Sequence, residues 1–573
     1  MNCKVANGPA NLTPHVRLVF HLATLISATI AWCIEIALVP PFLRYDPNGQ
    51  CLVSSLNMAA GTGSPLHCDH PNFPPQCLVA ALLKADMALL KKTTPACYRE
   101  HVFANFDRYM ILTDLASLFY LLAANAAFCE FGLRYYGAIP FLVIILLVRL
   151  PFSGEVAFHA DPLSYSIVTV HPDKVSLALL LLGNMLAADG ICNRNSKTFY
   201  AGCCALAITG ALKAPFILSL IPVFALLLIR TEPSFKYSVL TSALFRIIIV
   251  LAVCLLPLFV HPLECASRFI LHKKYTYSLP ENWVEYAVLN LRIICSALLV
   301  PGLGTAALIW KWQDDKVKLI GLNALIQLLL VICSRLADLH YYEIPVALCA
   351  HVFFLAIVPE VPRIAEYLKK YLTAAKTDRS SSTLKTTPWL LLSIVCLLRI
   401  SDAYHGCRFA KASAEDMIAV EAEVFRLSPP ESGPWVAWFM DEFPPSIIWD
   451  YYLKRRFPHI VPEKIHKLVW IDPTEEKTLA SLRDGKTLLL IDQCKLDRLA
   501  FLAPDVRKEL VNILMRWRII RQFNLRSGNR AWFMAGPNNF LYAVTIPGPA
   551  ECNMDDALTR QRMIRSENNN SNN

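Results

Sequence analysis

The chain has 573 residues, of which 55% are hydrophobic and 17% are charged. Soluble domains carry about 25% charged residues, so the composition excludes a protein that is soluble throughout. The formal net charge of +10 lies largely in short loops between apolar runs, and no basic stripe stands out, which argues against nucleic acid as a partner.

About eleven apolar stretches are expected to cross a membrane, because several of them reach the roughly 20 residues that one spanning helix needs. The first, from about Leu18 to Pro40, is too long for a signal-peptide core and lacks a small-residue cleavage site, so we expect a retained anchor. The sequence therefore predicts a polytopic α-helical membrane protein. The expected spans are residues 17–40, 108–129, 135–152, 174–190, 199–212, 215–230, 237–260, 286–310, 319–334, 343–361 and 388–400.

Lys and Arg are concentrated in every second connection between these stretches. Cytoplasmic loops carry an excess of such residues, so this side is predicted to be the cytoplasm, and the N-terminus lies there as well. An odd number of spans then places residues 401–573 outside, and the expected location is the inner (plasma) membrane. The basic residues that define the cytoplasmic side are Arg134, Arg194, Lys197, Arg230, Lys236, Lys311, Lys316, Lys318, Arg363, Lys369, Lys370, Lys376, Arg379 and Lys385.

Most of the remaining polar sequence falls on the opposite side. The segments 41–107, 153–173 and 261–285 are long for connectors, so we expect work at the outer membrane surface. Cysteines on this side could form disulfides in an oxidising compartment, but their spacing fixes no pairing, and no metal-type Cys-x-x-Cys occurs. These cysteines are Cys51, Cys68, Cys77, Cys97, Cys265, Cys407, Cys494 and Cys552.

Asp46 follows the first span and precedes Pro47 in the first outer loop. After it, residues 50–60 and 76–91 show amphipathic patterns that are too short and too mixed for spans, so two helices lying flat at the interface are expected. Two roles are open for Asp46. Its carboxylate can cap the first of these helices, or it can act as an active-site base.

Further charged residues are expected at the same outer boundary. Asp161 precedes a proline and Asp173 precedes a span, so each is either a turn or helix-cap residue or part of a shared site. Lys213 lies between two apolar stretches. A charge at membrane depth is costly and indicates function, unless the side chain only snorkels to the interface.

The tenth span is preceded by His340, Tyr341 and Tyr342. Aromatic residues at this position are typical of the interfacial belt of membrane proteins. The same side chains could also contact a phosphate or a sugar at the level of the lipid head groups.

Residues 17–361 resemble the membrane part of the GT-C class of glycosyltransferases that use lipid-phosphate sugars. Within that class the chain is similar to family 39-like enzymes, akin to protein O-mannosyltransferases and aminoarabinose transferases. One departure is that the family often has Asp-Glu in the first loop, where this chain has Asp46-Pro47. The features that carry the resemblance, in order, are Asp46 after the first span, Gly61, Pro65 and His70-Pro71 in the first loop, Pro172-Asp173 at the start of a span, a Gly-Ala-Leu-Lys run ending at Lys213, and His340-Tyr341-Tyr342 before Pro345.

The resemblance implies a polyprenyl-phosphate-linked sugar as donor and an inverting single displacement at the anomeric carbon. Asp46 would be the general base, and Asp173, preferred over Asp161 as the second acidic residue, would orient the acceptor or a cation. Lys213 and His340 would offset the charge of the departing phosphate, and Tyr341, Tyr342, Asp161 and His70 complete the expected substrate-binding set. The acceptor would be a lipid, a glycan or a protein. No metal site is predicted, although a divalent cation could assist, and no Gly-rich nucleotide loop occurs.

The C-terminal region, residues 401–555, is predicted to be a small extracytoplasmic α/β domain, followed by a disordered tail over 556–573. Its expected helices are 413–427, 445–456 and 504–522, and its expected strands are 435–439, 486–492 and 539–546. Two other function classes stay open. A transporter or lipid-sugar flippase would show an internal repeat and charges in the middle of spans, and an assembly protein in the membrane would leave Asp46 replaceable.

Overall fold

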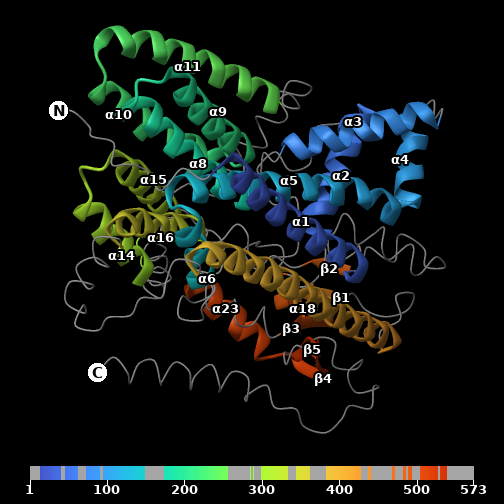
Figure 1. Cartoon of the computed structure of the whole chain (residues 1–573). Helices are drawn as coiled ribbons and strands as arrows, with labels where there is room; N and C mark the ends of the chain where they lie inside the picture. The colour runs from blue at the N-terminus through green and yellow to red at the C-terminus, as the bar shows by residue number, and fades with distance from the viewer. Residues whose placement is uncertain are drawn as a thin grey trace, which may run out of the picture. The chain divides into compact units, whose positions relative to one another are not determined.

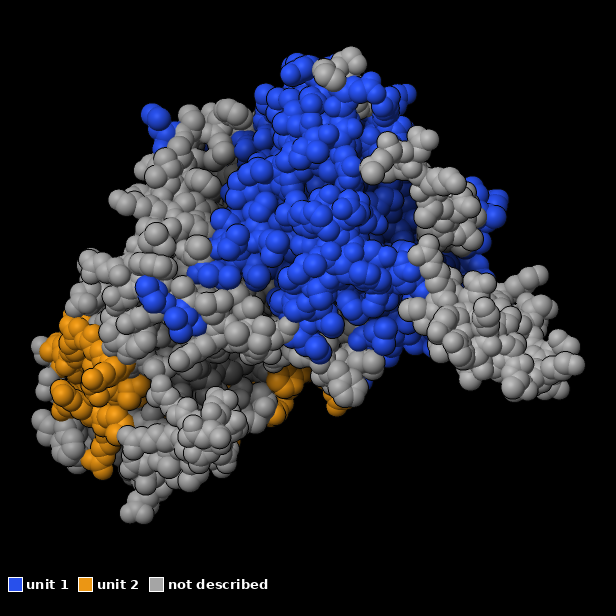
Figure 2. Space-filling model, turned by 90° about the vertical axis from the view of Figure 1, so that its left-hand side faces the viewer, with its two compact units in different colours: residues 1–407 blue, residues 408–573 orange. Residues whose placement is uncertain are grey.

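In the computed structural model the chain forms two compact units, Met1–Cys407 (unit 1) and Arg408–Asn573 (unit 2), which Figure 2 shows in different colours. The residues that the structure describes are 13–39, 45–61, 73–90, 94–148, 173–255, 299–332, 343–361, 383–427, 436–439, 468–470, 482–485, 488–492, 504–526 and 530–537, together with the single residues 263, 284, 288 and 480.

The described part of unit 1 consists of helices (Figure 1). They are α1 (Pro14–Leu38), α2 (Tyr45–Ala60), α3 (Phe73–Leu89), α4 (Pro95–Ala104), α5 (Phe106–Tyr135), α6 (Ala138–Val148), α8 (Asp173–Cys192), α9 (Ser196–Leu212), the 3-10 helix η3 (Ala214–Ser219), α10 (Leu220–Arg230), α11 (Pro233–Cys254), α14 (Leu299–Trp310), α15 (Asp315–Ile332), α16 (Glu343–Ile357), the 3-10 helix η6 (Val358–Glu360) and α18 (Thr383–Leu427), which continues into unit 2.

Five helical segments of the described residues are long and apolar enough to cross a membrane: Pro14–Leu38, Phe106–Tyr135, Lys174–Cys192, Lys236–Cys254 and Thr386–Ala412. The protein is therefore a polytopic integral membrane protein, as the sequence predicts. Each of the predicted spans contains at least part of a helix. The count of eleven spans stays a prediction, because several of these helices are shorter than a membrane is thick.

Helices α8 and α9 form a tightly packed antiparallel hairpin. A Cβ atom placed on Gly202 would lie 2.6 Å from the backbone nitrogen of Ala187, and one placed on Gly190 would collide with the backbone of Phe199. Only glycine allows two helix backbones to approach this closely. The two helices pair in antiparallel register, so each step along α8 is matched by an equal step backward along α9. The facing positions are 190 and 199, 187 and 202, and 183 and 206.

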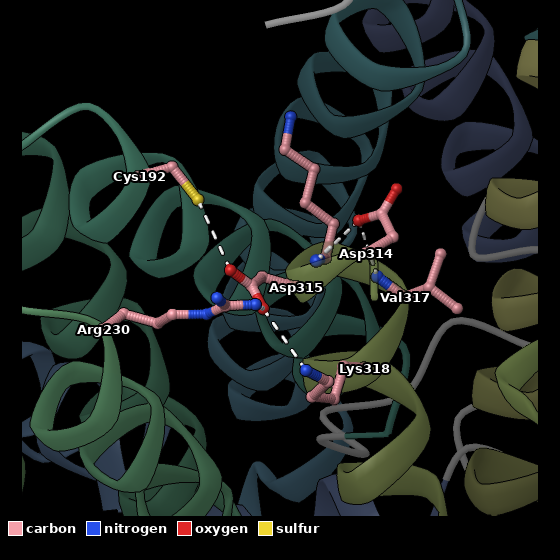
Figure 3. Close-up of polar contacts among 7 residues, drawn as sticks. Cys192, Arg230, Asp314, Asp315, Val317 and Lys318 are labelled. Atoms are coloured by element: carbon pink, nitrogen blue, oxygen red, sulfur yellow. Dashed lines mark hydrogen bonds and ion pairs between the residues drawn. The ribbon is translucent and has the colours of Figure 1, made fainter. Parts of the chain in front are cut away.

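One end of the unit 1 bundle is held by buried ion pairs, and we call it the paired end. Its two acidic residues are nearly buried: Asp189 is 9% exposed and Asp315 is 8% exposed. Each meets two cations, and Figure 3 shows the group around Asp315, where Arg230 and Lys318 approach from two helices. The pairs are Arg134–Asp189 at 3.4 Å, Lys316–Asp189 at 2.9 Å, Arg230–Asp315 at 3.0 Å and Lys318–Asp315 at 3.4 Å.

These pairs fix the direction of the helices. Arg134, Asp189 and Arg230 lie in the last turns of α5, α8 and α10, whereas Asp315 is the first residue of α15. The carboxylate of Asp314 also accepts the backbone N–H of Lys316 at 2.9 Å, which caps the start of α15. Three helices therefore end and one begins at the paired end. The opposite end, which we call the far end, is where α5 and α8 begin and α9 finishes.

A buried arginine connects α18 to the rest of unit 1. Arg399 is 2% exposed, and its Nη1 donates to Oδ1 of Asn125 in α5 at 2.5 Å and to the carbonyl of Thr24 in α1 at 3.5 Å. These contacts join α18 to α1 and α5 through polar groups inside an apolar bundle. A guanidinium in such surroundings requires hydrogen bonds to offset the cost of leaving water.

Unit 2 contains a five-stranded sheet in the order β2-β1-β3-β5-β4. The first three of these strands run parallel, and β5 is antiparallel to both β3 and β4. Alternate residues of the strands pack with α23 in one apolar cluster that includes Leu489, Leu510 and Trp532. The elements are β1 (Val436–Phe439), β2 (Leu468–Trp470), β3 (Leu488–Asp492), α23 (Pro504–Leu514), β4 (Arg518–Asn524) and β5 (Arg530–Ala535).

Two expectations for this region were wrong. The predicted helix 504–522 ends at Leu514 as α23, and β4 begins at Arg518. Ile519, Ile520 and Phe523 are typical strand residues, and pairing with β5 decides their conformation. The stretches 388–400 and 413–427 were expected to be separate helices, but α18 runs through both. The predicted helix 445–456, strand 539–546 and tail 556–573 lie outside the described residues.

Candidate functional site

Asp46, the expected base, is the second residue of α2. A carboxylate in the first turn of a helix interacts favourably with the positive end of the helix dipole. Asp46 thus lies inside the first turn and not at the N-cap position before the helix, and the role of an active-site base stays a prediction. The side chain of Asp46 lies outside the part of the chain that the structure describes.

The first turn of α2 is anchored to α5 through buried polar side chains. Nδ2 of Asn48 donates to Oδ1 of Asp114 at 3.2 Å. Oγ of Ser117 donates to the Thr113 carbonyl of its own helix at 2.8 Å and lies 3.4 Å from Oδ1 of Asn48. Nε1 of Trp32 in α1 donates to the backbone carbonyl of Asp114 at 3.0 Å. Asn48 and Ser117 are fully buried and Asp114 is 2% exposed, so three helices meet at a polar contact closed to solvent.

Helix α2 is more completely enclosed by protein than a helix lying alone at the interface would be, and its position relative to the membrane stays a prediction. Residues 51–56 of α2 are all buried, including Ser54 and Ser55. A helix lying in the interface would leave a continuous polar face in contact with water. Helix α2 instead packs against α3, α4 and α5, and its buried hydroxyls face protein. In contrast, α3 has exposed leucines, among them Leu78 and Leu82, each 40% exposed.

The segment between α1 and α5, which is predicted to be the first outer loop, is also stabilised at the junction of α3, α4 and α5. Oδ2 of Asp86 accepts hydrogen bonds from the hydroxyls of Tyr98 at 3.0 Å and Tyr109 at 2.6 Å. Burial, followed by the hydrogen bond to Asp86, raises the pKa of Tyr98 well above its usual value. The phenol therefore stays protonated and keeps its bond to the carboxylate at neutral pH.

Lys213 lies in a break between two helices. Pro215 lacks an N–H and would clash with a preceding carbonyl, so α9 ends at Leu212. The backbone of Lys213 is extended, with φ −146° and ψ 107°, and η3 follows. The side chain is half-buried, and its Nζ lies 5.8 Å from the centre of the Phe216 ring. A cation near an aromatic face gains electrostatic stabilisation.

Buried amides of α15 support this break. Nε2 of Gln327 donates to the carbonyl of Pro215 at 3.3 Å, and one turn earlier Nδ2 of Asn323 donates to Oδ1 of Asn184 in α8 at 2.6 Å. Gln327 is 3% exposed and the two asparagines are fully buried. Together they hold η3 and the α8–α9 hairpin against α15, which fixes the backbone that carries Lys213.

The helix packing brings the elements that carry Asp46, Asp173 and Lys213 to the far end. Asp173 is the first residue of α8, and its side chain lies outside the described residues. Continuing the register of the α8–α9 hairpin puts Lys213 level with Ser176, one turn into α8. Helix α2 meets α5 within three turns of the start of α5, which is also at the far end.

Buried hydroxyls without a hydrogen-bond partner among the described residues lie at this same end. They belong to Ser176 in α8 and Ser219, the last residue of η3, and both residues are fully buried. Burying a hydroxyl without a partner costs free energy. The far end thus offers polar groups that a ligand or water could satisfy close to Lys213.

The other expected site residues, His70, Asp161, His340, Tyr341 and Tyr342, lie outside the described part of the chain. Sequence reasoning did not select Glu35, Asp114 or Arg399 for the site, although all are buried within helices long enough to span a membrane. Their signal was a charge inside an apolar run. Among the described residues, no group of three or more His, Cys, Asp or Glu side chains could hold a metal ion.

Comparison with known proteins gives a structural likeness. No family model matches the chain, and no curated protein matches it by sequence. The chain is similar to the crystal structure of ArnT from Cupriavidus metallidurans bound to undecaprenyl phosphate, at a TM-score of 0.39 and 12% sequence identity, over 91% of this chain and 98% of that one.

Proposed function

We propose that the protein is an integral membrane glycosyltransferase. It transfers a sugar from a polyprenyl-phosphate donor to a lipid, glycan or protein acceptor on the outer face of the membrane, with inversion at the anomeric carbon. The observation that carries this proposal is the convergence at the far end: the first turn of α2 with Asp46, the start of α8 with Asp173, and the helix break with Lys213.

The proposed chemistry is a single displacement. Asp46 accepts the proton of the acceptor hydroxyl while the hydroxyl oxygen attacks the anomeric carbon. The bond from that carbon to the phosphate oxygen breaks, and the lipid phosphate leaves with the electron pair. Because the attack comes from the side opposite the leaving group, the configuration inverts. Asp173 orients the acceptor.

Lys213 supplies the positive charge that the departing phosphate needs. A fixed cation near developing negative charge lowers the barrier most when the site is shielded from water. The side chain of Lys213 is half-buried, and buried amides of α15 hold the backbone segment that carries it. His340 is proposed as a second cationic contact, with Tyr341, Tyr342, Asp161 and His70 as further substrate contacts. The partnerless hydroxyls of Ser176 and Ser219 support a polar ligand near Lys213.

The charge distribution supports the outer face as the place of reaction. The paired end collects Arg134, Arg230, Lys316 and Lys318, and such an excess of basic residues is typical of cytoplasmic ends. Arg17 near the start of α1 lies 3.8 Å from Glu130 near the end of α5, which supports an N-terminus on the cytoplasmic side. The far end, with the proposed site, then faces outward. Unit 2 is proposed to be extracytoplasmic and to contribute to acceptor choice.

The test is the substitution Asp46→Asn. The purified wild-type protein in lipid nanodiscs is expected to release polyprenyl phosphate from at least one donor in a panel of polyprenyl-phosphate hexoses, pentoses and amino sugars offered with lipid and peptide acceptors. Asp46→Asn should reduce that rate about 10²- to 10⁴-fold, the usual contribution of a general base. The matched control is Asp46→Glu, which keeps a carboxylate and should retain part of the activity.

Thermal unfolding of each variant shows whether its lower rate comes from the missing base or from a less stable fold. Full activity of Asp46→Asn would contradict the mechanism. A flippase gives a different result, because it moves the intact donor across the bilayer of a proteoliposome and leaves the sugar–phosphate bond uncleaved. Mass spectrometry of surface glycolipids and glycoproteins from cells with and without the protein would then identify the sugar and the acceptor.

A further inference from the structure

Asp114 is an unusual residue for its position. It lies two turns inside α5, in a segment long and apolar enough to span a membrane, and it is 2% exposed. A carboxylate in such a place costs free energy and usually has a function. Its Oδ1 accepts a hydrogen bond from Asn48, which belongs to the outer loop helix that carries Asp46. The buried acid therefore contacts the structural support of the proposed base.

Asn48 is held from two sides. It donates to Asp114 at 3.2 Å, and its Oδ1 lies 3.4 Å from Oγ of Ser117, whose single proton is shared with the Thr113 carbonyl at 2.8 Å. The two partners of the amide lie one turn apart on the same face of α5. Both partners lie on one rigid helix, and Trp32 of α1 fixes the backbone of that helix at Asp114. This geometry restrains rotation of α2 about its own axis as well as its distance from α5.

We propose that Asn48 and Asp114 form a buried positioning pair that sets the orientation of the first turn of α2, and with it Asp46. Residues two apart in a helix differ by more than half a turn, so any rotation of α2 that the pair permits would swing Asp46 through a wide arc. A displacement of about 1 Å at a reacting group can cost on the order of 10²-fold in rate. The inference deepens the proposed function and rests on it.

The pair allows a reversal experiment. Asn48→Asp removes the amide donor and puts a second carboxyl group opposite Asp114, so the two buried acids either repel or take up a proton between them. This variant should transfer sugar about 10²-fold more slowly per folded molecule, with an unchanged KM for the donor. Asp114→Asn keeps an oxygen that can accept from Asn48 and should lose less. The double variant Asn48→Asp with Asp114→Asn restores one donor and one acceptor and should recover most of the rate.

Two variants on the same face of α5 serve as graded controls. Ser117→Ala removes the second contact of Asn48 and should slow transfer several-fold. Thr113 is equally buried, but its hydroxyl donates to the Met110 carbonyl of its own helix at 2.7 Å. Thr113→Val removes a hydroxyl of the same burial at nearly constant volume and should leave the rate unchanged.

Hydrogen exchange measured on α2 in the full-length protein separates failure of this inference from failure of the proposed function. Asn48→Asp should speed exchange of the first turns of α2, and the double variant should restore protection. Wild-type protein that transfers no sugar from any donor overturns the proposed function alone. Sugar transfer in the wild type, with a double variant no better than Asn48→Asp in either measurement, overturns the positioning pair. Unchanged transfer by Asn48→Asp does so as well.

Discussion

The two ends of the unit 1 bundle differ in the groups that contact their buried acids. At the paired end, Asp189 and Asp315 each lie against two cations, and the ends of α5, α8 and α10 are joined to the start of α15. At the far end, the buried acid Asp114 accepts from the amide of Asn48, and buried amides of α15 hold the backbone near Lys213. Acids held by ion pairs far from a ligand serve stability, whereas charged groups beside the proposed site can act on a substrate.

This difference predicts that a charge removed at the far end changes the reaction, and one removed at the paired end changes stability. Asp46→Asn is expected to have the largest effect on rate. Further substitutions at the two ends should have smaller effects. For each one, activity and unfolding are measured on the same preparation.

The second largest effect is expected from Lys213→Met. Methionine keeps most of the length of the side chain and its apolar stem but removes the charge. Loss of one fixed group that stabilises developing charge costs about 10²- to 10³-fold in rate, and the unfolding midpoint should change little. Lys213→Arg is the matched variant and should recover part of the rate. An equal loss in both variants would mean that the shape of the break, and not the charge, is what matters.

At the paired end, Asp315→Asn should lower stability. Asp315 is 8% exposed, and the substitution removes its charged contacts with Lys318 and with Arg230, whose side chain is 38% exposed. Loss of a hydrogen bond to a charged group costs about 1.5–3 kcal/mol, and the exposure of Arg230 puts the expected loss at the lower end of that range, while the rate of sugar transfer per folded molecule should stay the same. Denaturant unfolding in detergent and turnover normalised to folded protein measure both quantities.

An exposed ion pair at the same end is the control. Arg194 and Glu232 lie 2.7 Å apart with side chains 66% and 65% exposed. Surface pairs contribute about 0–1 kcal/mol, so Glu232→Gln should leave stability and turnover nearly unchanged. A loss of turnover in Asp315→Asn that exceeds its loss of folded protein would show that the paired end also takes part in function.

The sequence predicts the helices of this bundle well, because apolar runs and proline breaks are local features. The end of α9 at Leu212 follows from Pro215 three residues later. The basic residues of the paired end could also be recognised, but their acidic partners could not. Arg230 and Asp315 are 85 residues apart, and Asn48 and Asp114 are 66 residues apart. Such contacts depend on which helix faces pack together, and a single sequence contains no periodic signal for that.

The same limit explains why α2 was expected at the membrane surface. Its serines and asparagine give a mixed polarity that is typical of an interfacial helix. In the structure, Asn48 and Ser55 are buried, and Ser55 satisfies its hydroxyl within its own helix by donating to the Cys51 carbonyl at 2.6 Å. Polarity of a residue type therefore did not predict exposure here. Strand β4 in unit 2 is a second case, because its sequence was predicted to be helical and its pairing with β5 makes it a strand.

Tyr98→Phe in α4 is expected to have a smaller effect than Asp315→Asn. Tyr98 is fully buried and donates to Asp86, which also accepts from Tyr109 at 2.6 Å, so the carboxylate keeps one partner after the substitution. Loss of one such hydrogen bond should cost about 1 kcal/mol of stability at neutral pH. Turnover should be unchanged, because the junction of α3, α4 and α5 supports the loop but holds none of the proposed catalytic groups.

The pH dependence of this effect gives its clearest signature. Burial raises the pKa of Tyr98 in the folded protein above the ordinary value of 10.0. The unfolded chain therefore loses this proton first, so the contribution of Tyr98 is fully present below about pH 10 and is lost as the pH rises further. The wild-type protein should lose stability above about pH 10 more steeply than Tyr98→Phe does. Parallel curves for the two proteins would show that Tyr98 is not held protonated by its surroundings, and the loop would then depend on apolar packing alone.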